Sequence, residues 1–516
     1  MRRLFIVLAV VTSAFTAITA QARDTAAQKG VYADLDALFA DAQLDINAPG
    51  LVYGVVADGK LAHLKTYGLR NIETGAPVTA KTRFRIASMT KMMTSLLVLD
   101  LVDAGKLSLD DPAEKYAPAL AALKYPTTDS RKITVRDLLH HTAGFVTDNP
   151  WADRQLARSP AEFDAFLASA AQLSRAPGEA YDYSNFGYAI IGRIIENVSG
   201  QSFAEQLDKR LLAPLGMKDT TLDMTAIPES ELAEAYHWLN NDYVKEPVLG
   251  SGAFDSIGGV WTTADDYAKF VAWYLAAWPA RDGADTGPIP RAVVRSVVDG
   301  VYFLGASQPP GLKGDQSCVM SAAYSMGLRM SRHCKAGLML THGGGLPGYG
   351  SYVIMMPELG LGVFVFANRT YAPTSGPAWD AALDLADSAV AARPAPAPAD
   401  KRVLAAYANV AKVYEAGDIN GGGISFADNF FPDRSVARWN AQLAEMKKAA
   451  GKCQTGAKLI PDGRLGGHFE WVCEDARIAG SLTMTPIDAG AVQELRLLLV
   501  QRGAGGRELI TDLDFH

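Results

Sequence analysis

Apolar residues follow two periodicities along the chain, and their order predicts the architecture. Near the N-terminus a helix is predicted over 31–44, and short apolar runs at 51–56 and 61–67 flank Asp58-Gly59, a dipeptide typical of a two-residue hairpin. Mostly helical patterns fill the middle. Four further strands are predicted after it: 324–330, 337–341, 351–356 and 361–367. We therefore expect the two ends to meet in one antiparallel sheet, with the middle forming a helical lobe.

A proline- and alanine-rich stretch at 391–400 interrupts these patterns. Closely spaced prolines cannot continue a helix and are typical of a semi-rigid linker. Beyond the stretch, two helices followed by strands are predicted: 402–416, 436–449, 466–473, 477–485 and 491–501. We expect a large α/β domain over 23–390 and a small α+β domain over 401–516.

The first 22 residues have the features of a secretory signal peptide. Arg2 and Arg3 precede a short apolar run, and Ala20-Gln21-Ala22 is a small-residue cleavage site. The run is shorter than the ~20 residues that a membrane span needs. We expect residues 1–22 to be removed and the mature protein to be secreted or periplasmic, without stable membrane insertion.

Composition and charge exclude several classes of protein. Of 516 residues, 49% are hydrophobic and 20% are charged, which is typical of a globular protein and excludes a disordered chain, a collagen and a coiled coil. The formal net charge is -7, so no basic excess exists to neutralise phosphates. We expect a small-molecule or short-peptide substrate as the partner, and no nucleic acid.

The four cysteines form two close pairs in the sequence. In an exported protein this spacing predicts two disulfides, Cys318–Cys334 and Cys453–Cys473. The alternative is four reduced core cysteines. A zinc site is less favoured because the chain has no C-x-x-C and no H-E-x-x-H. We expect no metal and no cofactor.

The first candidate for chemistry is Ser88-Met89-Thr90-Lys91, at the start of an apolar helix predicted over 89–104. Residues three apart share one helix face, so the Ser88 hydroxyl and the Lys91 amine should meet. Burial favours loss of the amine's proton, which makes Ser88 a candidate nucleophile and Lys91 a candidate base. The alternative is a serine that caps the helix and a lysine that extends to solvent.

Two later motifs carry groups that could complete a site. In Tyr183-Ser184-Asn185, a phenol can shuttle a proton and an amide can hold a substrate carbonyl. The alternative gives Asn185 a helix-capping role and Tyr183 a packing role. In His342-Gly343-Gly344-Gly345, glycines allow close backbone approach, and the Gly345 N–H can share an oxyanion with the Ser88 N–H. The alternative is a glycine-rich turn with a surface histidine.

With these three motifs in this order, the chain resembles the serine β-lactamase and penicillin-binding superfamily, specifically its class C-like branch. That branch includes class C β-lactamases, D,D-carboxypeptidases, D-aminopeptidases and family VIII esterases. The segments 84–88, 133–144 and 258–266 are also similar to the family, and the resemblance covers about residues 31–390. It implies a β-lactamase-like α/β fold: a central antiparallel sheet flanked by helices, a mostly helical lobe, and an active site between them.

The resemblance also implies a role for each motif residue. Ser88 would be acylated, and Lys91 and Tyr183 would move its proton to the leaving group. The substrate-binding residues would be Asn185, His342, Gly344 and Gly345. His342 stands where many relatives carry lysine, and a histidine is mostly neutral near pH 7, so strong β-lactamase activity is not favoured.

We therefore expect an exported serine hydrolase that forms an acyl-enzyme at Ser88 with a small ester or a D-amino-acid amide or peptide. Two alternatives are a β-lactamase or D,D-carboxypeptidase acting on cell-wall peptides, and a non-catalytic cell-wall-binding protein.

A Ser-His-Asp hydrolase is less favoured because no G-x-S-x-G occurs. Adjacent histidines on a helix do not usually face one metal, and no carboxylate stands at ligand spacing, so His140 and His141 are interpreted as structural. The C-terminal segment loosely resembles cystatin/NTF2-like modules.

Overall fold

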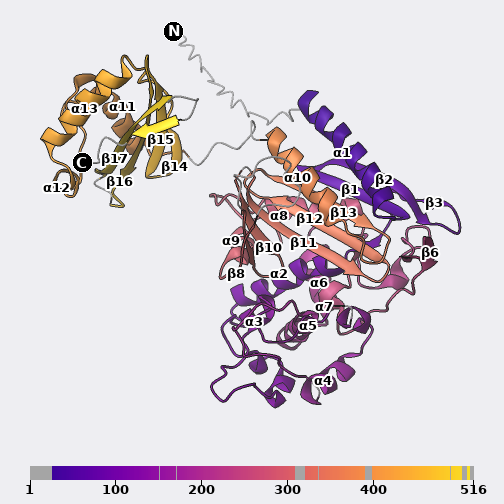
Figure 1. Cartoon of the computed structure of the whole chain (residues 1–516). Helices are drawn as coiled ribbons and strands as arrows, with labels where there is room; N and C mark the ends of the chain where they lie inside the picture. The colour runs from indigo at the N-terminus through magenta and orange to yellow at the C-terminus, as the bar shows by residue number, and fades with distance from the viewer. Residues whose placement is uncertain are drawn as a thin grey trace, which may run out of the picture. The chain divides into compact units, whose positions relative to one another are not determined.

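The computed structural model describes residues 26–149, 151–169, 171–307, 320–334, 336–389, 398–487, 490–502 and 508–511. The chain divides into two compact units, residues 1–393 and 394–516 (Figure 1). The predicted signal peptide at 1–22 and residues 391–397 of the predicted linker lie outside the described ranges.

The first unit has strands at both ends and mostly helices between them, as the sequence predicts. Its helices are α1 (Ala26–Asp45), α2 (Thr90–Asp103), α3 (Val135–Leu139), α4 (Pro160–Ser169), α5 (Asn185–Ser199), α6 (Phe203–Leu207), α7 (Asp255–Gly258), α8 (Ala264–Leu275), α9 (Arg291–Arg295) and α10 (Ser375–Ala389). Its strands are β1 (Gly50–Ala57), β2 (Lys60–Asn71), β3 (Ala76–Pro77), β4 (Phe84–Arg85), β5 (Tyr236–Leu239), β6 (Asp242–Lys245), β7 (Trp261–Thr262), β8 (Tyr302–Ser307), β9 (Met320–Tyr324), β10 (Arg329–His333), β11 (Gly337–Leu346), β12 (Tyr349–Met356) and β13 (Leu361–Ala367).

Nine of these strands form one sheet in the order β3-β2-β1-β13-β12-β11-β10-β9-β8, and neighbours run antiparallel. The expectation that the two ends of the domain meet is confirmed, because Leu51 of β1 lies opposite Ala367 of β13. The Asp58-Gly59 hairpin is confirmed as well: both residues have positive φ, as a type I′ turn requires.

The single strand expected over 324–330 is wrong. Tyr324 ends β9 and Arg329 begins β10, and the two strands pair with each other. Between them the Ser325 N–H donates to the Leu328 carbonyl, and Gly327 adopts φ 76°. Glycine tolerates this left-handed conformation at no steric cost, so an apolar segment that reads as continuous folds back on itself.

Helices cover both faces of the sheet, as Figure 1 shows for α1 and α10 on one side and the helical lobe on the other. Alternate residues of β13 face the two layers. Val363 and Val365 pack in the cluster beneath α1 and α10, whereas Phe364 and Phe366 belong to the larger core with α2 and α8. Because β13 is buried on both faces, it is apolar at nearly every position.

The second unit is α+β, with helices α11 (Lys401–Ala416), α12 (Phe430–Asp433) and α13 (Val436–Ala450). Its antiparallel sheet has the order β14 (Ile460–Gly463), β15 (Gly466–Val472), β16 (Arg477–Met484), β17 (Val492–Arg502) and β18 (Glu508–Thr511). The edge strands β14 and β18 are short and were not expected. Within the described ranges, no helix has both the length and the apolar character to cross a membrane.

The Cys453–Cys473 disulfide is confirmed in this second unit. Cys334 in the first unit is also disulfide-bonded. Its expected partner, Cys318, lies outside the described residues.

Candidate active site

Ser88 lies in a single 3-10 turn, η1 (Ala87–Met89), which leads directly into α2. Ala87 has φ 49°, a strained conformation for a residue with a side chain. The turn also lies against the glycines of β11. A Cβ on Gly344 would come within 2.3 Å of the Ile86 carbonyl oxygen, so only glycine permits this approach. The 343–345 glycines therefore lie within a strand, and the alternative of a glycine-rich turn is wrong.

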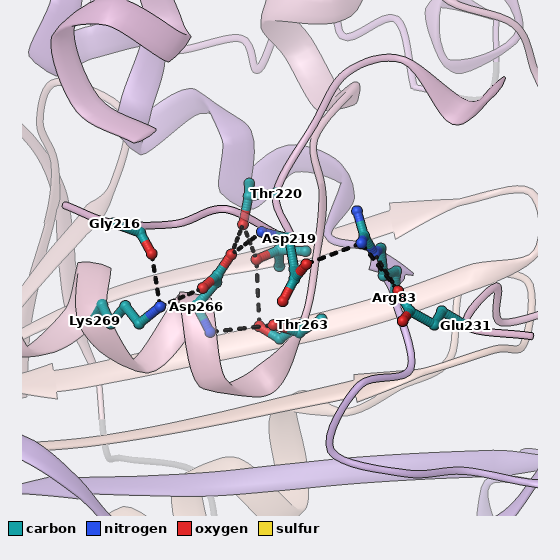
Figure 2. A network of polar contacts seen from close by, with 9 residues as sticks. Arg83, Gly216, Asp219, Thr220, Glu231, Thr263, Asp266 and Lys269 are labelled. Carbon is teal, nitrogen blue, oxygen red and sulfur yellow. Dashed lines mark hydrogen bonds and ion pairs between the residues drawn. The ribbon is translucent and has the colours of Figure 1, made fainter. Parts of the chain in front are cut away.

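The chain just before Ser88 is held by a network of polar contacts (Figure 2). Arg83 donates to Asp219 at 3.0 Å and to Glu231 at 3.0 Å. The backbone N–H of Asp219 in turn donates to the Asp266 carboxylate at 2.7 Å. Asp266 also accepts from Lys269 at 2.7 Å. The network joins the strand that precedes Ser88 to the start of α8. The start of α8 belongs to segment 258–266, so this segment helps to fix the position of Ser88 through these contacts.

Lys91 is fully buried and its Nζ has three neighbours: Ser88 Oγ at 3.0 Å, Asn185 Oδ1 at 2.6 Å and the Ile257 carbonyl at 2.8 Å. The amide oxygen and the carbonyl can only accept hydrogen bonds. A neutral amine has two N–H groups and one lone pair. The two acceptors use the N–H groups, so the lone pair is left for the Ser88 hydroxyl, the one neighbour that can donate.

The two titratable neighbours of Ser88, Lys91 and Tyr183, have pKa values shifted in opposite directions. Burial lowers the pKa of Lys91 to about 7, although the Asp153 and Asp148 carboxylates oppose this shift. Burial raises the pKa of the Tyr183 phenol well above its usual value, and a hydrogen bond with Ser88 opposes it only in part. Near neutral pH, Lys91 can therefore accept a proton, whereas Tyr183 keeps its own and can donate it.

Asn185 is the first residue of α5, and its neighbour Ser184 is the N-cap, whose hydroxyl accepts from the Gly187 N–H. The alternative of Asn185 as the cap is therefore wrong. The helix start is further held by Asp148, which accepts from the Asn185 N–H at 2.7 Å, the Phe186 N–H at 2.8 Å and the Ser184 hydroxyl at 3.0 Å. This frees the Asn185 side chain to contact Lys91.

His342 is buried on β11, so the alternative of a surface histidine is wrong. Its Nδ1 lies 2.6 Å from the Gly343 carbonyl, which can only accept, so Nδ1 carries the proton. Its Nε2 then accepts from the Tyr324 hydroxyl at 3.3 Å. Burial lowers the pKa of His342 to about 3, and the positive charge of Lys91 adds to the shift. His342 is thus a neutral side chain throughout the physiological range.

His141 is a second histidine that contacts the Tyr324 hydroxyl. The Ser184 N–H donates to His141 Nδ1 at 3.0 Å, so the ring proton is on Nε2, which lies 3.1 Å from the Tyr324 hydroxyl. One tyrosine therefore joins two neutral histidines. The interpretation of His141 as structural is consistent with these contacts.

The predicted residues surround one cleft of about 740 Å³, which Ser88, Tyr183, His342 and Gly345 line. Lys91 and Asn185 lie directly behind its wall. A hollow of about 820 Å³ in the helical lobe, beside Lys106 and Arg193, is slightly larger. Another hollow of about 890 Å³, beside Arg210, contains Ser199 in its lining. Because neither of these two hollows is lined by a residue of the three motifs, we place the candidate chemistry in the smaller cleft.

The sequence motifs missed several cleft residues because each comes from a segment without a motif. They are Asn149, Asp153, Tyr324, Arg329 and Tyr371. Asp153 stands in the turn η4 (Ala152–Gln155), and Tyr371 follows β13 with a positive φ. Arg329 could have been found from its pairing with Thr341, which is next to His342. That pairing could be predicted only if β10 was known to begin at Arg329.

Residues 35–388 match the Beta-lactamase family. The chain belongs to this family. Its relationship to the β-lactamase and penicillin-binding superfamily is therefore confirmed, and family members point to serine hydrolase activity in general.

Among curated relatives, an uncharacterized protein of Mycobacterium tuberculosis is 33% identical over 42% of this chain. This alignment spans 59% of that relative's length. The D-alanyl-D-alanine-carboxypeptidase/endopeptidase AmpH of Escherichia coli is 28% identical over 64% of this chain and 85% of its own length.

Two solved structures share the fold. The octameric penicillin-binding protein homologue from Pyrococcus abyssi has a TM-score of 0.57 and 20% identity, over 93% of this chain and 95% of its own. The D-alanine carboxypeptidase AmpC from Burkholderia cenocepacia has a TM-score of 0.54 and 22% identity, over 70% of this chain and 99% of its own. They confirm a β-lactamase-like fold.

Proposed function

We propose that the protein is an exported serine hydrolase that forms an acyl-enzyme at Ser88 with a peptide, amide or ester that carries a carboxylate near the scissile bond. The observation that carries the proposal is the Lys91 amine, whose two acceptor neighbours leave its lone pair for the Ser88 hydroxyl. The Cys453–Cys473 disulfide supports export, because disulfides persist in oxidising compartments.

In the proposed reaction, Ser88 Oγ attacks the substrate carbonyl carbon while its proton moves to Lys91 Nζ. The backbone N–H groups of Ser88 and Gly345 stabilise the negative charge on the carbonyl oxygen. When the tetrahedral intermediate collapses, the Tyr183 hydroxyl gives its proton to the leaving amine or alcohol and is restored from Lys91. Water then attacks the acyl-enzyme, and the same groups return the proton to Ser88.

Two residues of the sheet bear on the substrate class. Arg329 is exposed on β10, lines the cleft, and has no ion-pair partner among the described residues. A guanidinium in this position is suited to bind a carboxylate with two hydrogen bonds. His342 adds no charge, so Arg329 is the cation proposed to bind the leaving-group carboxylate. A peptide with a free C-terminus fits this arrangement, in line with the carboxypeptidase activity for which AmpH is named.

The test of the proposed mechanism is covalent labelling. The mature protein should gain the mass of one acyl or phosphonyl group when it is incubated with penicillin or a fluorophosphonate, and the Ser88→Ala variant should gain none. Intact mass spectrometry measures both. Absence of any adduct on the wild-type protein, under conditions that label AmpH, would overturn the proposal, as would equal labelling of Ser88→Ala.

The Arg329→Gln variant tests the proposed carboxylate site. We expect KM for a peptide with a free C-terminus to rise at least about tenfold, because a charge-assisted hydrogen bond contributes about 1.5–3 kcal/mol. The same peptide with a C-terminal amide should be unaffected. The control is Arg332→Gln on the same strand, since Arg332 pairs with Glu358 instead of lining the cleft. Equal losses on both peptides would contradict a carboxylate site.

A further inference from the structure

The cleft has a second charged side chain, Asp153, which the motifs and the proposed mechanism leave without a role. Its Oδ2 accepts from the Tyr371 hydroxyl at 3.0 Å, and its Oδ1 lies 3.3 Å from Asn185 Nδ2. Asp153 comes from the helical lobe and Tyr371 follows the sheet, so this pair joins the two sides of the cleft. Asp153 is linked to the nucleophile through Asn185 and Lys91.

The orientation of the neighbouring amides follows from these contacts. Lys91 Nζ donates to Asn185 Oδ1 at 2.6 Å, so the Asn185 NH₂ group points the other way. There it donates to Asn149 Oδ1 at 2.7 Å. Asn149 therefore turns its carbonyl oxygen, and not its NH₂ group, toward the same Asn185 NH₂ group that contacts Asp153. An amide oxygen and a carboxylate lie on the same side of the cleft.

Tyr371 adds an aromatic ring beside these oxygens. Its ring packs against Gly345, where a Cβ would come within 2.8 Å of Tyr371 Cδ1. The group of Asp153, Asn149 and Tyr371, which we call the acyl-side cage, thus combines a carboxylate, an amide oxygen and an aromatic ring. These are the three kinds of group that bind an ammonium ion in proteins.

The charge balance of the site supports a cationic occupant. Asp153 is almost completely buried, and burying a carboxylate without a cation is costly. Lys91 compensates only while it is protonated, and the proposed base must be neutral before it can act. Burial also raises the pKa of Asp153, and the positive charge of Lys91 opposes this shift only in part.

We propose that the acyl-side cage binds the free α-ammonium group of the substrate's acyl residue. The inference rests on the proposed function, in which Asn185 holds the acyl part of the substrate. An α-ammonium group is two covalent bonds from the carbonyl carbon that Ser88 attacks, so it lies on the Asn185 side of the cleft. With Arg329 binding the carboxylate on the leaving side, the substrate class is a short peptide whose amine and carboxylate are both free.

The test compares two substrates that differ only in the amine, D-alanyl-p-nitroanilide and N-acetyl-D-alanyl-p-nitroanilide. We expect the wild-type protein to prefer the free amine by at least tenfold in kcat/KM. Asp153→Asn should remove this preference by raising KM for the free amine, and any change in kcat that follows from the lost charge beside Lys91 should be the same for both substrates. A residue that merely positioned Asn185 would lower kcat for both substrates alike.

Asp129→Asn is the matched control, because Asp129 is an exposed loop residue and the substitution changes the net charge equally. Tyr371→Leu is a second variant and should raise KM more for the free-amine substrate than for the acetylated one. Preference of the wild-type protein for the acetylated substrate, or parallel losses on both substrates, would overturn the inference. Failure of Ser88 to be labelled by any probe would instead overturn the proposed function.

Discussion

Replacing Lys91 with methionine should lower kcat/KM by about 10²- to 10⁴-fold, the range expected for loss of a general base. Methionine resembles lysine in length and is apolar, so it should occupy the buried space left by the fully enclosed side chain. The substitution removes the lone pair available to Ser88 Oγ. The measurement is the acylation rate in single-turnover kinetics with a chromogenic substrate, with circular dichroism to verify folding.

The pH dependence of the same rate identifies the base. Lys91 acts only when neutral, and its pKa is lowered to about 7, so wild-type kcat/KM should be low in acid and rise through about pH 7. His342 contributes no inflection above about pH 3, and Tyr183 stays protonated because its pKa is raised. Lys91→Met should lose the inflection near pH 7. Persistence of the same inflection in this variant would assign it to another group.

Replacing Asp148 with alanine should lower the free energy of unfolding by about 3 kcal/mol. The substitution leaves three buried donors without their acceptor, and each unsatisfied buried donor costs about 1–3 kcal/mol. Two of them are backbone N–H groups at the start of α5, so Asn185 should shift and activity should fall as well. Urea denaturation followed by tryptophan fluorescence measures the stability.

The control for Asp148 is Glu205, which completes an exposed capping box at the start of α6. Water can replace Glu205, so Glu205→Ala should cost no more than about 1 kcal/mol. A loss for Asp148→Ala no larger than that for Glu205→Ala would mean that water enters the α5 start and satisfies the freed groups.

The contact between Ser88 and Lys91 and the closing of the sheet could be predicted from the sequence pattern. A serine and lysine three apart on an apolar helix must meet, and alternating apolar strands at both ends must bury their faces somewhere. The N-cap role of Ser184 was harder to predict from the sequence. Serine and asparagine cap equally well, and the deciding contact comes from Asp148, 36 positions earlier.

Residues whose contacts depend on distant parts of the chain could not be predicted from the sequence either. Tyr324 stood inside an expected strand, and its placement between His141 and His342 depends on the turn at Gly327. Asp153 and Tyr371 are 218 positions apart and meet only because the helical lobe faces the sheet. No periodicity in the sequence records such a pairing.

The pairing of β1 with β13 has a consequence for how the protein is made. The sheet cannot close until residue 367 has left the ribosome, since Leu51 must wait for a partner more than 300 positions later. Loop closure over such a distance is slow, and until then β1 and β2 form only a hairpin. The large unit therefore cannot complete its sheet while its first 366 residues are being made, and the apolar edge of β1 stays without its partner for that time.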